Sequence, residues 1–136
     1  MSQTGSLVYL DSSALVKLVL PEPESRALLE YIATRPDRVT SAIATVEVVR
    51  AACRASDDPA VEQRAREVVA GVNLLTLHDE LLDEAAKVFP RRLRALDALH
   101  LATALRLGGD LEAMVAYDAA LAEAARNAGI RVVAPA

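Results

Sequence analysis

The chain alternates short segments of strand length with longer segments whose apolar residues recur at helical spacing. The short segments cover residues 7–10, 38–41, 72–77, 113–117 and 130–133, and we predict a β-strand for each. The longer segments predict helices over residues 11–20, 25–34, 43–54, 59–70, 79–89, 96–107 and 118–127. Strands that alternate with helices are typical of an α/β protein whose mostly parallel sheet is covered on both faces.

Proline and glycine residues mark the ends of several of these helices. Pro21 follows the first helix and Pro90 the fifth, because proline lacks the amide hydrogen that a helix interior needs. Gly71 and Gly129 close the fourth and seventh helices. The sequence holds no repeat, low-complexity segment or linker. We therefore expect residues 1–136 to form a single domain.

Composition adds the kind of core and the compartment. Hydrophobic residues make up 53% of the chain and aromatic residues only 3%, so the core must be built from aliphatic side chains. Cys53 is the only cysteine, which rules out an intrachain disulfide and favours a reducing compartment. No apolar run approaches the roughly 20 residues of a membrane span, and residues 1–6 lack the features of a secretory signal. We expect a cytoplasmic protein without membrane association.

Two bulk properties bear on the partners of the chain. The formal net charge of −4 argues against broad, nonspecific binding to nucleic acid, although it allows a local basic patch and bound cations. The large apolar share predicts an exposed apolar patch, and such patches mark protein interfaces.

Four acidic residues lie at equivalent places in the predicted topology. Asp11 and Asp118 directly follow strands, while Glu47 and Asp97 lie in the first turns of helices. In an open parallel sheet these places meet at the carboxyl ends of the strands, where ligands bind. The sequence thus predicts that four carboxylates from distant segments share one rim of the sheet.

Each aspartate taken alone has a structural explanation as a helix cap or as a favourable charge at a helix start. Glu47 is harder to explain in this way, because residues 42–49 are otherwise apolar and a charge among them needs a partner or a metal. Clustered carboxylates stay ionised only beside a cation or with raised pKa values. Oxygen ligands select Mg²⁺ or Mn²⁺, which can activate water for attack on a phosphodiester.

Four segments of the chain resemble the acidic motifs of the PIN-domain nucleases, and within them the VapC-type toxins of bacterial toxin–antitoxin systems. They are residues 10–18 (LDSSALVKL), 41–47 (SAIATVE), 96–104 (LDALHLATA) and 115–121 (VAYDAAL). The first and third are the specific ones, and the resemblance covers nearly the whole chain in order and spacing. It implies a three-layer α/β/α fold and a Mg²⁺-dependent endoribonuclease toxin of a type II module. It also implies a cognate antitoxin and a homodimer as partners.

Carried over to this sequence, the resemblance implies that Asp11, Glu47, Asp97 and Asp118 hold one or two Mg²⁺ ions, for which Mn²⁺ can substitute. These four residues are our candidate catalytic and metal-binding set, for in-line attack of an activated water on an RNA phosphodiester. The resemblance also suggests that Ser12 lends a hydroxyl group. Many relatives carry Thr or Ser two positions before the last acid, where this chain has Ala116.

His100 follows Asp97 by three residues and so shares its helix face. Two interpretations stand: a general base or metal ligand, and a structural residue hydrogen-bonded within the core. Several arginines near the predicted rim are candidates for contacts with the RNA backbone, because guanidinium groups suit phosphate. They are Arg50, Arg91, Arg92 and Arg94, and an ordinary solvated surface explains them equally well.

Other functions fit the sequence less well. A haloacid dehalogenase needs a second aspartate at position 13, which is Ser13, and a receiver domain needs a lysine that residues 131–135 do not offer. No glycine-rich turn of a dinucleotide-binding fold follows the first strand. A catalytically inactive PIN-like interaction protein, whose acids hold a structural metal, remains as an alternative.

Overall fold

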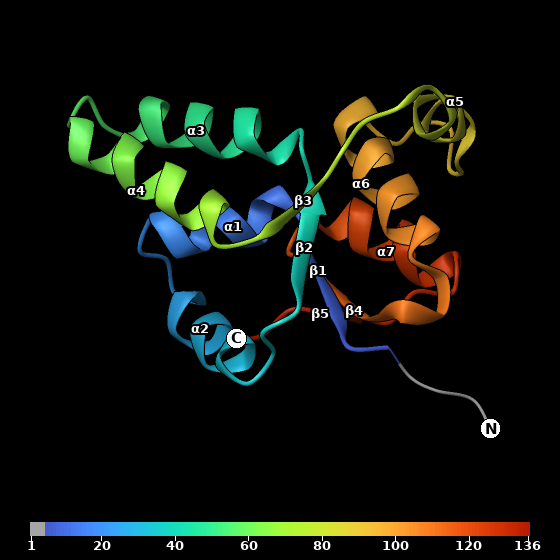
Figure 1. Ribbon diagram of the computed structural model, residues 1–136, viewed down its shortest axis with the longest axis horizontal. Helices are drawn as coiled ribbons and strands as arrows, with labels where there is room; N and C mark the ends of the chain where they lie inside the picture. The colour runs from blue at the N-terminus through green and yellow to red at the C-terminus, as the bar shows by residue number, and fades with distance from the viewer. Residues whose placement is uncertain (1–4) are drawn as a thin grey trace.

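Five parallel strands form one central sheet in the computed structural model, which describes residues 5–136 (Figure 1). The strands are β1 (Leu7–Leu10), β2 (Arg38–Ser41), β3 (Asn73–Leu75), β4 (Leu111–Val115) and β5 (Val132–Val133). Their order in the sheet is β3-β2-β1-β4-β5, with Tyr9 of β1 opposite Val39 of β2 on one side and Met114 of β4 on the other. β1 is therefore the central strand, and the chain adds strands first to one side of it and then to the other.

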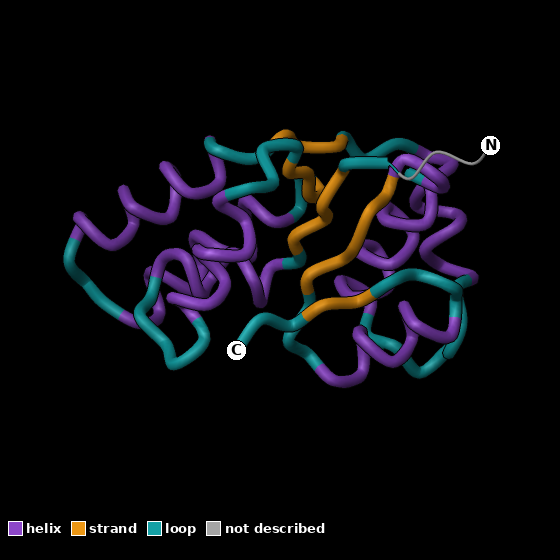
Figure 2. Tube along the Cα trace, turned by 90° about the horizontal axis from the view of Figure 1, so that it is seen from below, coloured by secondary structure: helices purple, strands orange, loops and turns teal. Residues whose placement is uncertain are grey.

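Helices cover both faces of this sheet, and Figure 2 shows the resulting three layers. One layer holds α1 (Ser12–Val19), α2 (Ser25–Ala33), α3 (Ala44–Ala55) and α4 (Pro59–Ala70). The other holds α5 (Asp79–Lys87), α6 (Ala95–Arg106) and α7 (Ala119–Asn127), with a 3₁₀ turn at Gly108–Asp110. The predicted three-layer α/β/α fold with a parallel sheet is confirmed.

Alternating side chains of β1 divide the core between these layers. Val8 and Leu10 pack against the first four helices, and Tyr9 points to the opposite face. There it shares an apolar cluster with Leu101 of α6 and Leu121 of α7. All five of these side chains are fully buried, so the central strand ties the two apolar clusters together.

The elements differ from the predicted ranges mainly at their ends. α5 ends at Lys87 rather than at Phe89, because the proline ring at position 90 excludes the helical conformation for the residue before it. β3 spans Asn73–Leu75 within the predicted 72–77, and β5 spans Val132–Val133 within 130–133. Both are edge strands with a hydrogen-bonded neighbour on one side only, which shortens their regular pairing.

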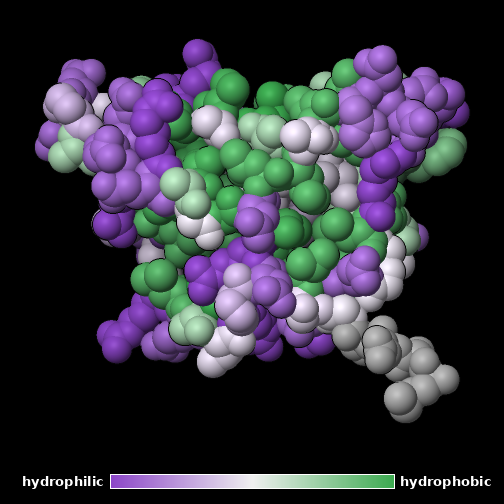
Figure 3. All heavy atoms as spheres, viewed as in Figure 1, coloured by the Kyte–Doolittle hydropathy of each residue, from purple (hydrophilic) through white to green (hydrophobic). Residues whose placement is uncertain are grey.

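Several large apolar side chains remain at the surface. On the face seen in Figure 3, apolar groups gather across the middle of the molecule, between hydrophilic groups to either side. Among residues 5–136 the exposed ones are Leu29, Val46, Leu74, Leu77, Leu82, Phe89, Leu96 and Leu105. No helix in residues 5–136 has the length and apolar character needed to cross a membrane.

Two leucines one turn apart on α6 test this assignment of core and surface. Leu101 is 0% exposed and Leu105 is 38% exposed. We predict that Leu101→Ala lowers the free energy of unfolding by about 2–5 kcal/mol, because it leaves a cavity in a close-packed cluster. The matched Leu105→Ala should cost less than about 1 kcal/mol. Urea denaturation followed by circular dichroism measures both values, and equal losses would contradict the packing described here.

Candidate active site

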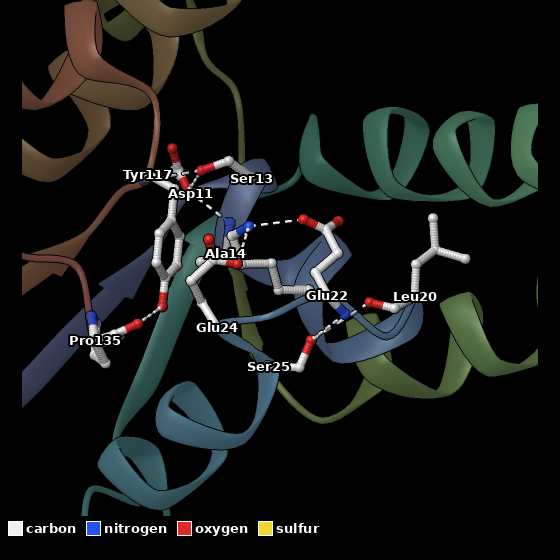
Figure 4. A network of polar contacts seen from close by, with 10 residues as sticks. Asp11, Ser13, Ala14, Leu20, Glu22, Glu24, Ser25, Tyr117 and Pro135 are labelled. Atoms are coloured by element: carbon white, nitrogen blue, oxygen red, sulfur yellow. Dashed lines mark hydrogen bonds and ion pairs between the residues drawn. The ribbon is translucent and has the colours of Figure 1, made fainter.

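Asp11 lies at the carboxyl end of the central strand, where it caps the first helix. Its Oδ1 atom accepts hydrogen bonds from the Ser13 hydroxyl at 2.7 Å and from the Ala14 amide at 2.9 Å (Figure 4). Only 2% of the residue is exposed. Burial raises the pKa of this carboxyl group to about 6, although the two hydrogen bonds and nearby His100 act in the opposite direction.

Glu47 projects from the first turn of α3 and is held by two donors. Its Oε1 atom accepts a hydrogen bond from the Ser12 hydroxyl at 2.6 Å and from Nε2 of His100 at 2.7 Å. Partial burial alone would raise the pKa of Glu47, but the hydrogen bonds from His100 and Ser12 outweigh burial and hold the pKa below its usual value. The structure thus favours the ionised form of this carboxylate.

Asp97 and Asp118 lie at the starts of α6 and α7, and their negative charges repel each other. Asp118 caps α7, with its Oδ1 atom 2.9 Å from the Leu121 amide, whereas Asp97 accepts no hydrogen bond within residues 5–136. Burial raises the pKa of Asp97 first, and the negative charges of Asp118 and Glu47 raise it further. Asp11 and Asp97 also repel each other. The structure brings all four predicted acids to the same rim.

The donor set suits a hard divalent cation. In Asp11, Glu47 and Asp118 one carboxylate oxygen is taken by protein donors, while no donor in residues 5–136 contacts the other oxygen. Within the same residues, no three acidic, histidine or cysteine side chains converge closely enough to hold an ion by themselves. The rim therefore offers free carboxylate oxygens of the right chemistry without forming a closed cage.

His100 proves to be both buried and part of the site. It is 1% exposed, contacts Glu47 through Nε2, and contacts the hydroxyl of Tyr9 through Nδ1 at 2.7 Å. Sequence reasoning missed Tyr9 and Ser13, the second of which also accepts a hydrogen bond from the Tyr117 amide at 3.1 Å. A signal for Tyr9 was present: it precedes Asp11 by two positions in an extended segment, so the two share a face.

Two grooves open beside the carboxylates, and the arginines divide between them. A groove of about 770 Å³ is lined by Arg92 and Arg94 together with Asp97 and Asp118. A second groove of about 740 Å³ contains Arg50 near Glu47 and Ser12, and it also reaches Asp118. Arg91 lines neither groove, because its guanidinium stacks 4.9 Å from the ring of Phe89.

Lys17 also lines the second groove, but its charge is already matched. Its ammonium group is 2.7 Å from a carboxylate oxygen of Glu22 and 3.1 Å from one of Glu24, and it lies 4.7 Å from the centre of the Tyr117 ring. Both glutamates belong to the segment that follows α1 (Figure 4). The arginines are therefore the better candidates for binding phosphate.

Comparison with known proteins assigns the chain to a family. Residues 8–127 match the PIN domain family. Ribonuclease VapC46 of Mycobacterium tuberculosis is 45% identical over 128 residues, which is 94% of this chain and 97% of the relative. Among solved structures, VapC20 of the same species, a sarcin-ricin loop cleaving toxin, superposes with a TM-score of 0.74 at 18% identity, covering 94% and 99% of the two chains.

A toxin-antitoxin complex from Klebsiella pneumoniae superposes with a TM-score of 0.65 at 23% identity, over 82% of this chain and 86% of that one. These two structural likenesses show the shared fold, and the sequence matches show descent. The chain belongs to the PIN domain family and is a homologue of the VapC ribonucleases.

Proposed function

We propose that this protein is a divalent-cation-dependent endoribonuclease and the toxin of a type II toxin–antitoxin module. The observation that carries the proposal is the gathering of Asp11, Glu47, Asp97 and Asp118 at the carboxyl ends of the strands, with raised pKa values at Asp11 and Asp97. The 45% identity to a protein named a ribonuclease supports the activity.

The four carboxylates are the proposed ligands of Mg²⁺, with Mn²⁺ as a substitute. A bound cation supplies charge neutralisation and water activation for hydrolysis of a phosphodiester. The residues of this chain do the positioning: Ser13 orients Asp11 and Ser12 orients Glu47. Because no donor in the described part of the chain contacts Asp97, its charge is the one that most needs a cation.

RNA is the proposed substrate, and its backbone would enter along the two grooves that meet at Asp118. Arg50 lies on one side of the carboxylates and Arg92 and Arg94 on the other, so phosphates flanking the scissile bond can be paired on both sides. This local arrangement allows an acidic protein to hold a polyanion. Arg91 is the weakest of the candidate contacts, since it lines neither groove and stacks on Phe89 at the edge of the first.

The proposed partners are an antitoxin and a second copy of this chain. The same fold is known from a toxin-antitoxin complex, and eight large apolar side chains are exposed within residues 5–136. Exposed apolar surface of this kind is typical of protein interfaces. Coexpression with the neighbouring gene product and light scattering of the purified protein would test the two partners separately.

Replacement of one carboxylate tests the proposed reaction. Asp11→Asn removes the charge and keeps an oxygen that can cap α1, so we predict at least an about 100-fold loss of RNA cleavage with the fold intact. The matched control is Asp58→Asn, because Asp58 caps α4 in the same way, with its Oδ1 atom 2.9 Å from the Ala60 amide. Cleavage of a labelled total-RNA preparation measures both variants.

EDTA should abolish cleavage by the wild type, and either Mg²⁺ or Mn²⁺ should restore it. In cells without the antitoxin, the wild type and Asp58→Asn should arrest growth, whereas Asp11→Asn should not. Full cleavage in EDTA would refute the metal-dependent mechanism. Equal toxicity of wild type and Asp11→Asn, together with no RNA cleavage by the purified wild type, would favour the inactive interaction protein instead. Sequencing the cleaved ends after induction would identify the RNA.

The pKa of Asp11 predicts a pH-dependent stability of the metal-free protein. The folded-state pKa is about 6, whereas an unfolded chain has about 3.9, so the folded state holds more protons between these values. Its free energy of unfolding should therefore fall as pH rises from about 4 to about 6 and stay lowered above that range. Asp11→Asn removes this cost and should be about 1–3 kcal/mol more stable than wild type at neutral pH in EDTA.

Urea denaturation of both proteins in EDTA at a series of pH values measures this difference, which should vanish below about pH 3, where Asp11 is protonated in both states. Saturating Mn²⁺ should stabilise the wild type more than Asp11→Asn. Parallel stability curves for the two proteins at all pH values would show that Asp11 is not buried as a carboxylate.

The arginines that line the grooves should act on substrate binding. Arg50→Ala and Arg92→Ala are each predicted to raise KM for RNA about threefold to tenfold, with kcat changed less than about twofold, because each removes a phosphate contact remote from the reacting bond. The effect should shrink as salt rises. Arg26→Ala is the matched control, since Arg26 lies on α2 outside both grooves with a side chain 92% exposed. Identical KM values for all three variants would remove the arginines from the RNA path.

A further inference from the structure

A line of polar groups runs from the middle of the sheet to the candidate site. The Tyr9 hydroxyl contacts Nδ1 of His100 at 2.7 Å, and Nε2 of His100 contacts Oε1 of Glu47 at 2.7 Å. The two rings also meet edge to face, with centroids 5.8 Å apart and planes at 78°. The three residues come from β1, α6 and α3, so this line joins both helix layers through the sheet.

The first two members of this line are completely enclosed. Tyr9 is 0% exposed and His100 is 1% exposed, and both lie among the aliphatic side chains that pack α6 on the sheet. An apolar residue at position 100 would meet the packing needs of this region without any polar partner. A buried polar group is costly unless all its hydrogen-bonding atoms are paired, and here both ring nitrogens are paired.

The partners also decide where the protons lie. A carboxylate can only accept, so Nε2 of His100 is the donor toward Oε1 of Glu47. In the neutral ring Nδ1 is then the acceptor, and the Tyr9 hydroxyl donates to it. The hydrogen bond from Tyr9 therefore favours the tautomer that donates to Glu47.

The hydrogen bond from His100 falls on the same carboxylate oxygen as that from Ser12. Oε1 of Glu47 therefore receives two donors, from α1 and from α6, while Oε2 receives none from residues 5–136. Two donors from different helices fix both the position and the rotation of a carboxylate better than one. They also leave Oε2 as its available oxygen.

We propose that His100, oriented by Tyr9, is a positioning residue that holds Glu47 in the conformation needed to bind the divalent cation. The inference rests on the proposed function, and it assigns His100 a role through Glu47 rather than contact with RNA or with the ion. Hydrogen-bond partners of metal ligands commonly change metal affinity or activity 10–100-fold when they are removed.

The test compares three variants of the full chain by calorimetric titration with Mn²⁺. His100→Leu fills the space without a donor and should weaken Mn²⁺ binding about 10–100-fold. His100→Gln can place an amide donor toward Glu47 and should restore affinity to within about threefold of wild type. Tyr9→Phe removes one hydroxyl and should weaken binding severalfold, because the tautomer is no longer fixed.

Leu81→Ala is the matched control for stability. Leu81 is a buried aliphatic residue of α5 that packs against α6, and it contributes no polar group to the line from Tyr9 to Glu47. It should lose stability without losing Mn²⁺ affinity. In RNA cleavage at a fixed, subsaturating Mg²⁺ concentration, His100→Leu should lower kcat and leave KM for RNA unchanged, because its effect passes through the ion.

A folded His100→Leu protein with wild-type Mn²⁺ affinity would overturn the inference. If that variant does not fold, Tyr9→Phe and His100→Gln decide: unchanged affinity in the first, or affinity in the second as weak as in Asp97→Asn, would also overturn it. Failure of the proposed function looks different. In that case the wild type itself would bind no Mn²⁺, whereas failure of this inference alone would leave wild-type binding intact and Asp97→Asn defective.

Discussion

Repulsion among carboxylates at one rim of the sheet is the constraint on which the rest of the site depends. All strands of the sheet β3-β2-β1-β4-β5 are parallel, so their carboxyl ends lie at the same edge. Four acids from distant segments of the chain are brought together at that edge. The acids do not relax away from one another, because each is fixed by its element. Asp11 and Asp118 cap helices, Glu47 is held by two donors, and Asp97 is left with a raised pKa.

The helices themselves offset part of this repulsion. Four helix N-termini point at the rim, since Asp11 and Asp118 occupy N-cap positions and Glu47 and Asp97 lie in first turns. Each such end stabilises a nearby negative charge by about 0.3–1 kcal/mol. That amount is too small to restore a normal pKa to Asp11, because burial raises the pKa of this residue to about 6. The helix ends therefore offset only part of the repulsion among the carboxylates.

The sequence was sufficient to predict the rim and insufficient to predict how it is held. Asp11 and Asp118 could be placed because each follows an apolar segment of strand length. Glu47 could be placed because it is the only charged residue in an otherwise apolar segment, where a charge needs a partner or a metal. The contact between His100 and Glu47 joins residues 53 positions apart, and that between Tyr9 and His100 joins residues 91 apart. No periodicity encodes such contacts, since they depend on how α3 and α6 lie against the sheet. The end of α5 was misplaced for a local reason, the effect of Pro90 on Phe89.

Three of the acids use their two oxygens for different purposes: one completes a helix cap or receives side-chain donors, and no donor in residues 5–136 contacts the other. The hydrogen bonds that shape the backbone around these acids therefore leave one oxygen of each carboxylate available. A ligand bound through those oxygens would leave the helix caps intact. Under the proposed function, a divalent cation would then bind or leave without unwinding α1 or α7, and the surfaces that a partner recognises would keep their shape while the activity changed.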